Sequence, residues 1–532
     1  MASKPLPAIV NSTPATTPTK RYVDIDILVL VADELTFHGR HALLPLLHAN
    51  RAIYDLCSHL LLRNVVRIHV GGSSIQWHLE CFGAFLFNIN CSESRLRRLQ
   101  HLEICLANEN EEESMSEQSF ASLLRILEHA EHLETLGFPY GVPAGNVSSL
   151  SRSLNQLTRL QSMTFCGPLT PMIFPLIGQL SLSLTKLVIQ LRTAQFGNAE
   201  EMRARFYPLL CLAPLASTLT YLDVTSDYKV DFSGPPVQFS AMKTLAIRAS
   251  LSANDVLRGP LISLYPKLRQ LHIEDVHIPW DFTEALHQEN TDTELANQDS
   301  WPELESLSGP VHVLYGLALA SKVHSLCILV NGFMDEDENR LIEVCRAARP
   351  SILHITCVMS INSLSVLSTV IGASGAATVR IHLQVEDQEF PVIPQYDPRT
   401  LLDNIHVCLE GTSVTAVSVF VDWDELAKFC VDRSTGVNCS EPFAPPYDCV
   451  SISGWLRKYP VEGLMKRLAL STPTLRDIFI EIFQYPRRVD YWRNVEGDEG
   501  TIFNTEKIAG SVSQLLDLEE KVMSRGCICD SS

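Results

Sequence analysis

A short apolar pattern that recurs along the chain restricts the possible fold more than any other feature. Each copy is an apolar residue, two intervening residues, a second apolar residue, one intervening residue and a third apolar residue. The second and third positions would share one face of a β-strand, because side chains alternate along a strand. Each copy therefore predicts one buried strand. The copies are Leu99/Leu102/Ile104, Leu133/Leu136/Phe138, Leu160/Met163/Phe165, Leu184/Leu187/Ile189, Leu219/Leu222/Val224, Met242/Leu245/Ile247, Leu268/Leu271/Ile273, Val323/Leu326/Ile328, Ile352/Ile355/Cys357 and Leu475/Ile478/Ile480.

The segments between the copies predict helices. In residues 120–132, for example, Phe120, Leu123, Leu127 and Ala130 fall on one helical stripe. From Leu99 to Leu268, successive copies begin 23 to 35 residues apart. A strand and a helix of that size cannot bury their own apolar faces, so neighbouring units must stack. We therefore predict an α/β solenoid over residues 69–485, with parallel strands on one side and helices on the other.

This spacing resembles the leucine-rich-repeat family over roughly residues 95 to 485. Regular members place Asn or Cys three residues beyond the third apolar position, where Ala107, Pro168, Arg192 and Asp227 stand here. The resemblance implies a concave strand surface that binds a partner, in an irregular repeat. The alternative is a doubly wound α/β enzyme. That fold needs glycine-rich turns after its strands, whereas Pro, Ser, Thr and acidic residues follow the copies here.

Residues that alternate with the buried pair would point away from the core, onto that concave surface. They are chemically mixed, and no nucleophile, base and orienting group emerge together. We therefore predict a recognition surface on a protein that is not an enzyme. The candidate substrate-binding residues are His101, Glu103, Lys186, Tyr221, Asp223, Gln270, His272 and His354, with Gln190 and Thr356 at equivalent positions.

Residues 22–68 do not fit the repeat and predict a small helical module. Its apolar content exceeds what so short a segment can bury, which predicts a docking site. The candidate anchors are Ile27, Leu28, Leu35, Leu43, Leu47 and Ile53.

The stretches at residues 26–28, 33–35 and 43–53 resemble an F-box, in the form found at the start of fungal F-box proteins with degenerate leucine-rich repeats. Residues 60–68 are similar to the strand that leads from such a module into the repeats. The resemblance implies docking of the anchors onto a Skp-family adaptor, and through it onto a cullin scaffold and a ubiquitin-conjugating enzyme. The repeats would then hold an unknown protein substrate. The alternatives are that the module only caps the first unit, or that the chain is a scaffold with no link to a ligase.

Composition and charge restrict the partners and the compartment. The 532 residues carry a formal net charge of −19, which disfavours nucleic acid and anionic membrane as partners. No apolar run approaches a membrane span; the best, residues 25–32, is short and contains Asp26. The first residues are rich in proline and lack the apolar stretch of a signal peptide, and 15 scattered cysteines are typical of reduced thiols. We predict an intracellular protein, in the cytoplasm or the nucleus.

Neither a metal nor a cofactor is predicted. His38, His41 and His48 lack further ligands at suitable spacing, and Cys527 and Cys529 lie in what we interpret as a frayed tail. The remaining boundaries are a flexible tail at residues 1–21, an insertion loop at about 422–458 and, within 486–532, a helix that covers the open end of the stack.

Overall fold

The structure is a computed structural model of the whole chain. It describes residues 31, 45–47, 53–54, 57–62, 66–70, 75–87, 92–106, 117–138, 147–168, 173–180, 183–192, 205–206, 211–226, 229–230, 237–249, 258–274, 280–297, 301, 304–319, 321–330, 335–358, 363–384, 402–422, 459–483 and 488–493. The predicted tail at 1–21, the body of the insertion loop and the C-terminal helix lie outside these residues.

One sheet of 15 strands runs through the described chain, in the order β1-β2-β3-β4-β5-β7-β9-β10-β11-β12-β13-β14-β15-β16-β17. Neighbouring strands are parallel from β1 to β16, and only the last pair, β16 with β17, is antiparallel. The strands are β1 Val66–Val70, β2 His101–Leu106, β3 Thr135–Phe138, β4 Ser162–Pro168, β5 Lys186–Arg192, β7 Tyr221–Ser226, β9 Thr244–Ala249, β10 Gln270–Glu274, β11 Ser306–Pro310, β12 Ser325–Val330, β13 Ile352–Val358, β14 Thr378–Gln384, β15 Ala416–Asp422, β16 Asp477–Phe483 and β17 Arg488–Arg493. A separate two-stranded sheet pairs β6 Arg205–Phe206 with β8 Lys229–Val230.

Helices connect most of these strands. The α-helices are α4 Ile75–Leu86, α5 Ser92–Arg98, α6 Glu117–His129, α7 Val147–Gln156, α8 Ile173–Gly178, α10 Arg258–Leu264, α11 Trp280–Asn297, α12 Val311–Gly316, α13 Asp335–Ala348, α14 Ser363–Ser374 and α18 Val461–Ser471. Short 3-10 helices stand at η1 Ser58–Leu62, η5 Ala213–Leu215 and η7 Ile405–Leu409.

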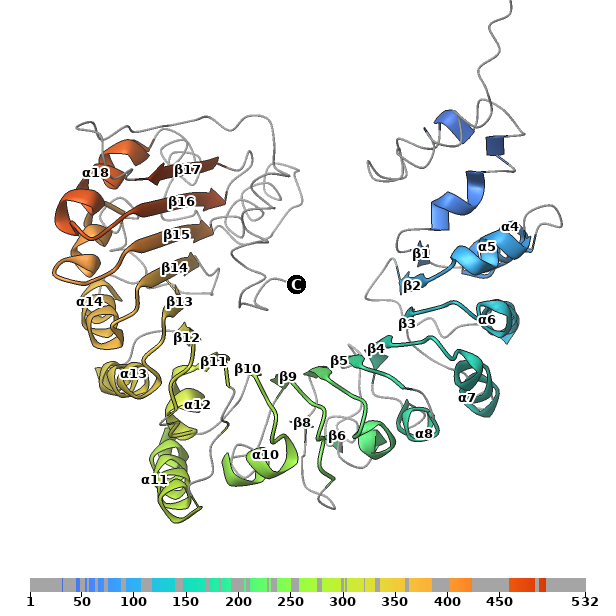
Figure 1. Ribbon diagram of the computed structural model, residues 1–532, viewed down its shortest axis with the longest axis horizontal. Helices are drawn as coiled ribbons and strands as arrows, with labels where there is room; N and C mark the ends of the chain where they lie inside the picture. Colours follow the sequence, from blue (N-terminus) through green and yellow to red (C-terminus); the bar gives the residue numbers. More distant parts are fainter. Residues whose placement is uncertain are drawn as a thin grey trace, which may run out of the picture.

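The strands line the inside of an open arc, and the helices line its outside (Figure 1). The apolar core lies between these two layers. The predicted α/β class, with a parallel sheet flanked by helices, is therefore confirmed, and the arrangement is solenoid-like. We call the sheet surface that points away from the helices the concave face.

The strand register explains why the apolar copies recur. Pairing places the second apolar position of each copy opposite its counterpart on the next strand, so that a continuous row of buried side chains runs along the sheet. In β4, β5 and β7 these residues are Met163, Leu187 and Leu222, none of them accessible to solvent. Each fully buried side chain of this kind contributes roughly 1.5–3 kcal/mol to stability. The row crosses every junction between units, so it holds the stack together.

One copy was assigned two residues too far along the chain. Leu326 of β12 pairs with Leu353, and Ile328 pairs with Ile355. The copy in β13 is therefore Pro350/Leu353/Ile355, not Ile352/Ile355/Cys357; Ile352 is only half-buried. The error arose because residues 352, 353, 355 and 357 are all apolar, so the local pattern fits both registers. A shift of two residues preserves the face of every side chain, so the predicted orientation of His354 is unaffected.

Adjacent units are also tied by a repeated backbone arrangement. Just before most strands, one carbonyl accepts N–H groups from two consecutive residues of the next unit. Gln100 O accepts from Glu134 N at 2.7 Å and Thr135 N at 3.0 Å, and Thr185 O accepts from Thr220 N at 2.8 Å and Tyr221 N at 3.0 Å. The backbone thus ties neighbouring units together.

Candidate binding surface

The concave face carries all the predicted substrate-binding residues. His101, Lys186, Tyr221 and Gln270 stand at the first outward position of their strands. Glu103, Asp223, His272 and His354 stand at the second. The register makes Lys186 and Tyr221 direct cross-strand neighbours, and Lys186 Nζ lies 4.8 Å from the centre of the Tyr221 ring. The other predicted residues are spread along the arc.

A group of charged side chains on this face lies on β7, β9 and β10. Arg248 Nε is 3.1 Å from Glu274 Oε2, and Arg248 Nη1 is 3.8 Å from Asp223 Oδ2. His272 Nε2 lies 2.7 Å from Glu274 Oε1, close enough for a hydrogen bond. The Tyr221 hydroxyl donates a long hydrogen bond, 3.4 Å, to Asp223 Oδ2. Glu274 thus takes the two shortest contacts, which leaves Asp223 the less well compensated carboxylate.

The pKa values of the group reflect this imbalance. Burial raises the pKa of Asp223 above its ordinary value, and the charge of Arg248 does not offset it. Burial acts the same way on Glu274, but hydrogen bonds and charge from His272 and Arg248 outweigh it and lower the pKa of Glu274. Burial, with the Asp223 carboxylate beside it, raises the pKa of Tyr221 to about 12.

On β7, two polar atoms are buried without a hydrogen-bond partner. One is Asp223 Oδ1, on a residue that is only 4% exposed, and the other is Thr225 Oγ1. Both residues lie on β7, two positions apart, and so they share the concave face. Buried polar groups are almost always paired in folded proteins, so this pair calls for a physical reason.

A row of half-buried rings crosses the C-terminal half of the concave face. His354 and His382 stack at a centroid distance of 6.4 Å, His382 meets the edge of Phe420 at 6.2 Å, and Phe420 lies 5.7 Å from Phe479. Cys327 Sγ is 3.6 Å from His354 Nδ1. Of these residues, the sequence analysis named only His354.

Arg248 and Glu274 were missed as well. Each lies one residue beyond the third apolar position of its copy, so the same alternation extended by one step along β9 and β10 identifies them as outward-facing. The register places Arg248 directly opposite Glu274, so aligning the two copies also identifies these residues as cross-strand neighbours.

At the N-terminus, Leu47 and Ile53 are buried, 3% and 4% exposed, in a small apolar cluster with Cys57 and Leu60. These two predicted anchors therefore pack inside the chain. The other four anchors, Ile27, Leu28, Leu35 and Leu43, lie outside the described residues.

A fully buried arginine that the sequence analysis missed joins this N-terminal region to the sheet. Arg95 of α5 donates two hydrogen bonds to Ser58 Oγ of η1, at 3.2 and 2.7 Å, and a short one to the Phe85 carbonyl. Its guanidinium also lies over the Phe85 ring, 4.2 Å from the centroid. The predicted module and the first units are thus held in one packing arrangement.

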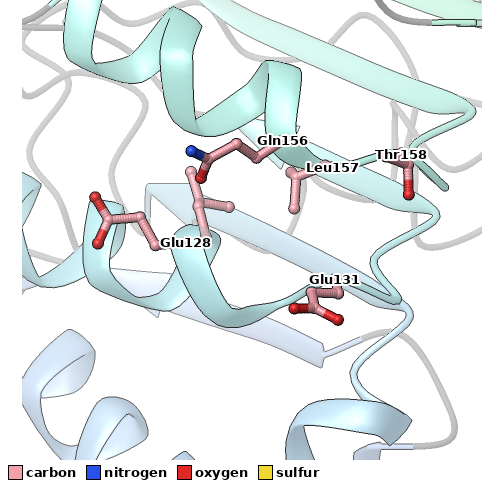
Figure 2. Close-up of a pocket in the computed structure, with 6 residues that line it drawn as sticks. Glu128, Glu131, Gln156, Leu157 and Thr158 are labelled. Atoms are coloured by element: carbon pink, nitrogen blue, oxygen red, sulfur yellow. The ribbon is translucent and has the colours of Figure 1, made fainter.

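A hollow of about 420 Å³ opens between the ends of α6 and α7, on the helical side of the arc (Figure 2). Buried Leu127 and Leu157 line it together with exposed Glu128, Glu131, Gln156 and Thr158. It lies apart from the predicted binding residues.

Among the residues that the structure describes, no group of three or more His, Cys, Asp or Glu side chains is placed to hold a metal ion. The histidines at 38, 41 and 48 and the cysteines at 527 and 529 lie outside that set. Within the described helices, none has both the length and the apolar character required to cross a membrane.

The chain matches no protein-family model, and no curated protein matches it significantly in sequence.

Proposed function

We propose that this protein is the substrate-recognition subunit of an SCF-type ubiquitin ligase. In this proposal the arc is a degenerate leucine-rich-repeat solenoid whose concave face binds a protein substrate. The N-terminal module is an F-box that docks onto a Skp-family adaptor, and the protein itself catalyses no reaction.

One observation carries the binding part of the proposal. One sheet, parallel from β1 to β16, lines the inside of an arc (Figure 1), and the residues at its outward positions differ in chemistry from strand to strand. Such a surface suits an extended or irregular protein partner, because each strand can contact a different part of it. The net charge of −19 favours a basic or neutral partner.

The ligase part of the proposal is supported by the resemblance of residues 26–28, 33–35 and 43–53 to an F-box. In helix-in-groove recognition, apolar anchors such as Leu28 would enter a groove of the adaptor. The packing of Arg95 against Ser58 supports a fixed orientation of substrate relative to adaptor.

A scaffold with no link to a ligase is the second candidate, favoured by the burial of Leu47 and Ile53. Side chains that already pack against Cys57 and Leu60 stabilise the chain itself and are less available to an adaptor. On this alternative, the module at residues 22–68 only caps the first unit.

Capture of purified full-length protein by a Skp-family adaptor separates the two candidates. We expect the adaptor to capture the wild type, and Leu28→Asp to reduce capture at least tenfold. Leu470→Asp is the matched control, because this leucine of α18 is 81% exposed and far from the module in the chain. Leu47 is avoided because a charge there would unfold its cluster. No capture of the wild type, or equal capture of Leu28→Asp, refutes the ligase proposal.

A further inference from the structure

The strands on either side of Asp223 cannot satisfy its carboxylate. In the sheet register Asp223 stands between Val188 of β5 and Ala246 of β9. Both side chains are apolar and offer no hydrogen bond. The partners of Asp223 therefore come from positions farther along its own and neighbouring strands, and they contact only Oδ2.

Arg248 is the natural counter-ion for Asp223, but it is committed elsewhere. Its Nε contact with Glu274 is 3.1 Å, whereas its nearest approach to Asp223 is 3.8 Å. Asp223 Oδ1 and the neighbouring Thr225 Oγ1 remain buried with no partner. Asp223, Glu274 and Arg248 together carry one net negative charge.

This arrangement suits a site that is completed by a bound ligand. A carboxylate that burial penalises, next to a partnerless hydroxyl, contributes little to folding but offers two acceptors to an incoming donor. A guanidinium has several donors in a planar fork, which can reach a carboxylate and a nearby hydroxyl together, whereas an ammonium is a point charge.

We propose that Asp223 Oδ1 and Thr225 Oγ1 form a subsite for an arginine side chain of the protein partner. The partner's arginine enters as Arg248 leaves its 3.8 Å contact with Asp223 and pairs with Glu274 alone. Arg248 is the partly exposed member of the pair, with 17% of its side chain accessible against 6% for Asp223, so it can move without unfolding the strand. The inference rests on the proposed use of the concave face to bind protein, and it names the chemistry of the residue bound.

The probe is N-acetyl-arginine methylamide, titrated calorimetrically into the full-length protein at low salt, where charge pairing is least screened. Its citrulline counterpart has nearly the same shape without the charge. We expect the arginine compound to bind and the citrulline compound to bind at least tenfold more weakly. Equal binding of both, or of neither, overturns the proposal.

Two variants test the residues and are expected to act in opposite directions. Asp223→Asn should weaken arginine binding at least tenfold, while Arg248→Gln should tighten it severalfold, because the internal competitor is gone. Glu117→Gln is the matched control, a carboxylate-to-amide change at an exposed residue of helix α6, outside the concave face, and should bind as the wild type does. Binding by Asp223→Asn within twofold of the wild type, or weaker binding by Arg248→Gln, contradicts the subsite.

Stability provides a readout that separates binding from a purely structural role. If the role of Asp223 is to bind a ligand, Asp223→Asn should melt at the same temperature as the unliganded wild type or higher. If it serves the fold, that variant should melt lower, and the proposal fails. The adaptor takes no part in these measurements, so a negative result here leaves adaptor docking as it stands, and loss of adaptor docking leaves this subsite as it stands.

Discussion

Replacing Arg95 with methionine tests how firmly the N-terminal region is joined to the sheet. Methionine keeps an apolar stem of similar length over Phe85 but removes every hydrogen bond that the guanidinium donates. Ser58 Oγ and the Phe85 carbonyl would both lose a charged partner. Hydrogen bonds that involve a charged group contribute roughly 1.5–3 kcal/mol each, so two such partners amount to about 3–6 kcal/mol. The opening of this region should become about 10² to 10⁴ times more frequent, at about 1.4 kcal/mol per tenfold change.

Native-state amide exchange measures this effect locally. Amides of η1 and β1 should exchange faster by that factor in Arg95→Met, whereas amides of β12 to β14 should not change, because distant units of a stack open independently. Arg98→Met is the control, since Arg98 is exposed on the same helix and should cost less than about 0.5 kcal/mol. A change below about 1 kcal/mol at η1 in Arg95→Met would show that the buried guanidinium does not hold the two parts together.

The remaining predictions concern β11 and the charge cluster. Gly309→Ala should lose about 1–3 kcal/mol in thermal unfolding, because the new Cβ would lie 2.7 Å from the Ile273 carbonyl oxygen. Gly372→Ala, where helix α14 leaves open space, should instead gain about 0.5–1 kcal/mol, and equal effects of the two changes would contradict the packing described. The lowered pKa of Glu274 means that its stabilisation is present above its ordinary value of 4.5 and is lost as pH falls through the lower folded value, so the deficit of Glu274→Gln should be larger at pH 7 than near pH 3.5. The raised pKa of Asp223 has the opposite sign, so any stability gain of Asp223→Asn at pH 7 should shrink as pH falls toward 3.8; a gain that grows on acidification would refute the assignment.

Most of the sheet could be predicted because one spacing recurs in the sequence and burial enforces it. Leu187 and Ile189, for instance, are both fully buried, as two positions on one strand face should be. The prediction missed individual strands. In β11 the third apolar position is Gly309, held small by the Ile273 carbonyl, so the pattern fails there although the strand pairs normally. In β15, Val414, Val417 and Val419 follow the same spacing with valine in place of leucine, and the copy was overlooked.

The binding surface was predictable in its orientation but not in its contacts. Alternation along β7 and β10 is enough to place Asp223 and His272 on the concave face. It does not show that Arg248 contacts carboxylates on both neighbouring strands, or that its contact with Glu274, at 3.1 Å, is 0.7 Å shorter than its contact with Asp223, at 3.8 Å. Arg95 was missed for a similar reason, because a charged residue in a short helix is expected at the surface until its partners are known.

The carbonyl that accepts two N–H groups at most junctions has a consequence for how freely the sequence of such a chain can change. Because main-chain atoms make this tie, it persists whatever side chains stand at residues such as Gln100 or Lys243. The sequence of a unit can therefore be substituted, lengthened or duplicated while the neighbouring strands keep their register, provided that its two inward-facing apolar residues are retained. The geometry of such a protein can outlast any recognisable likeness among its own segments.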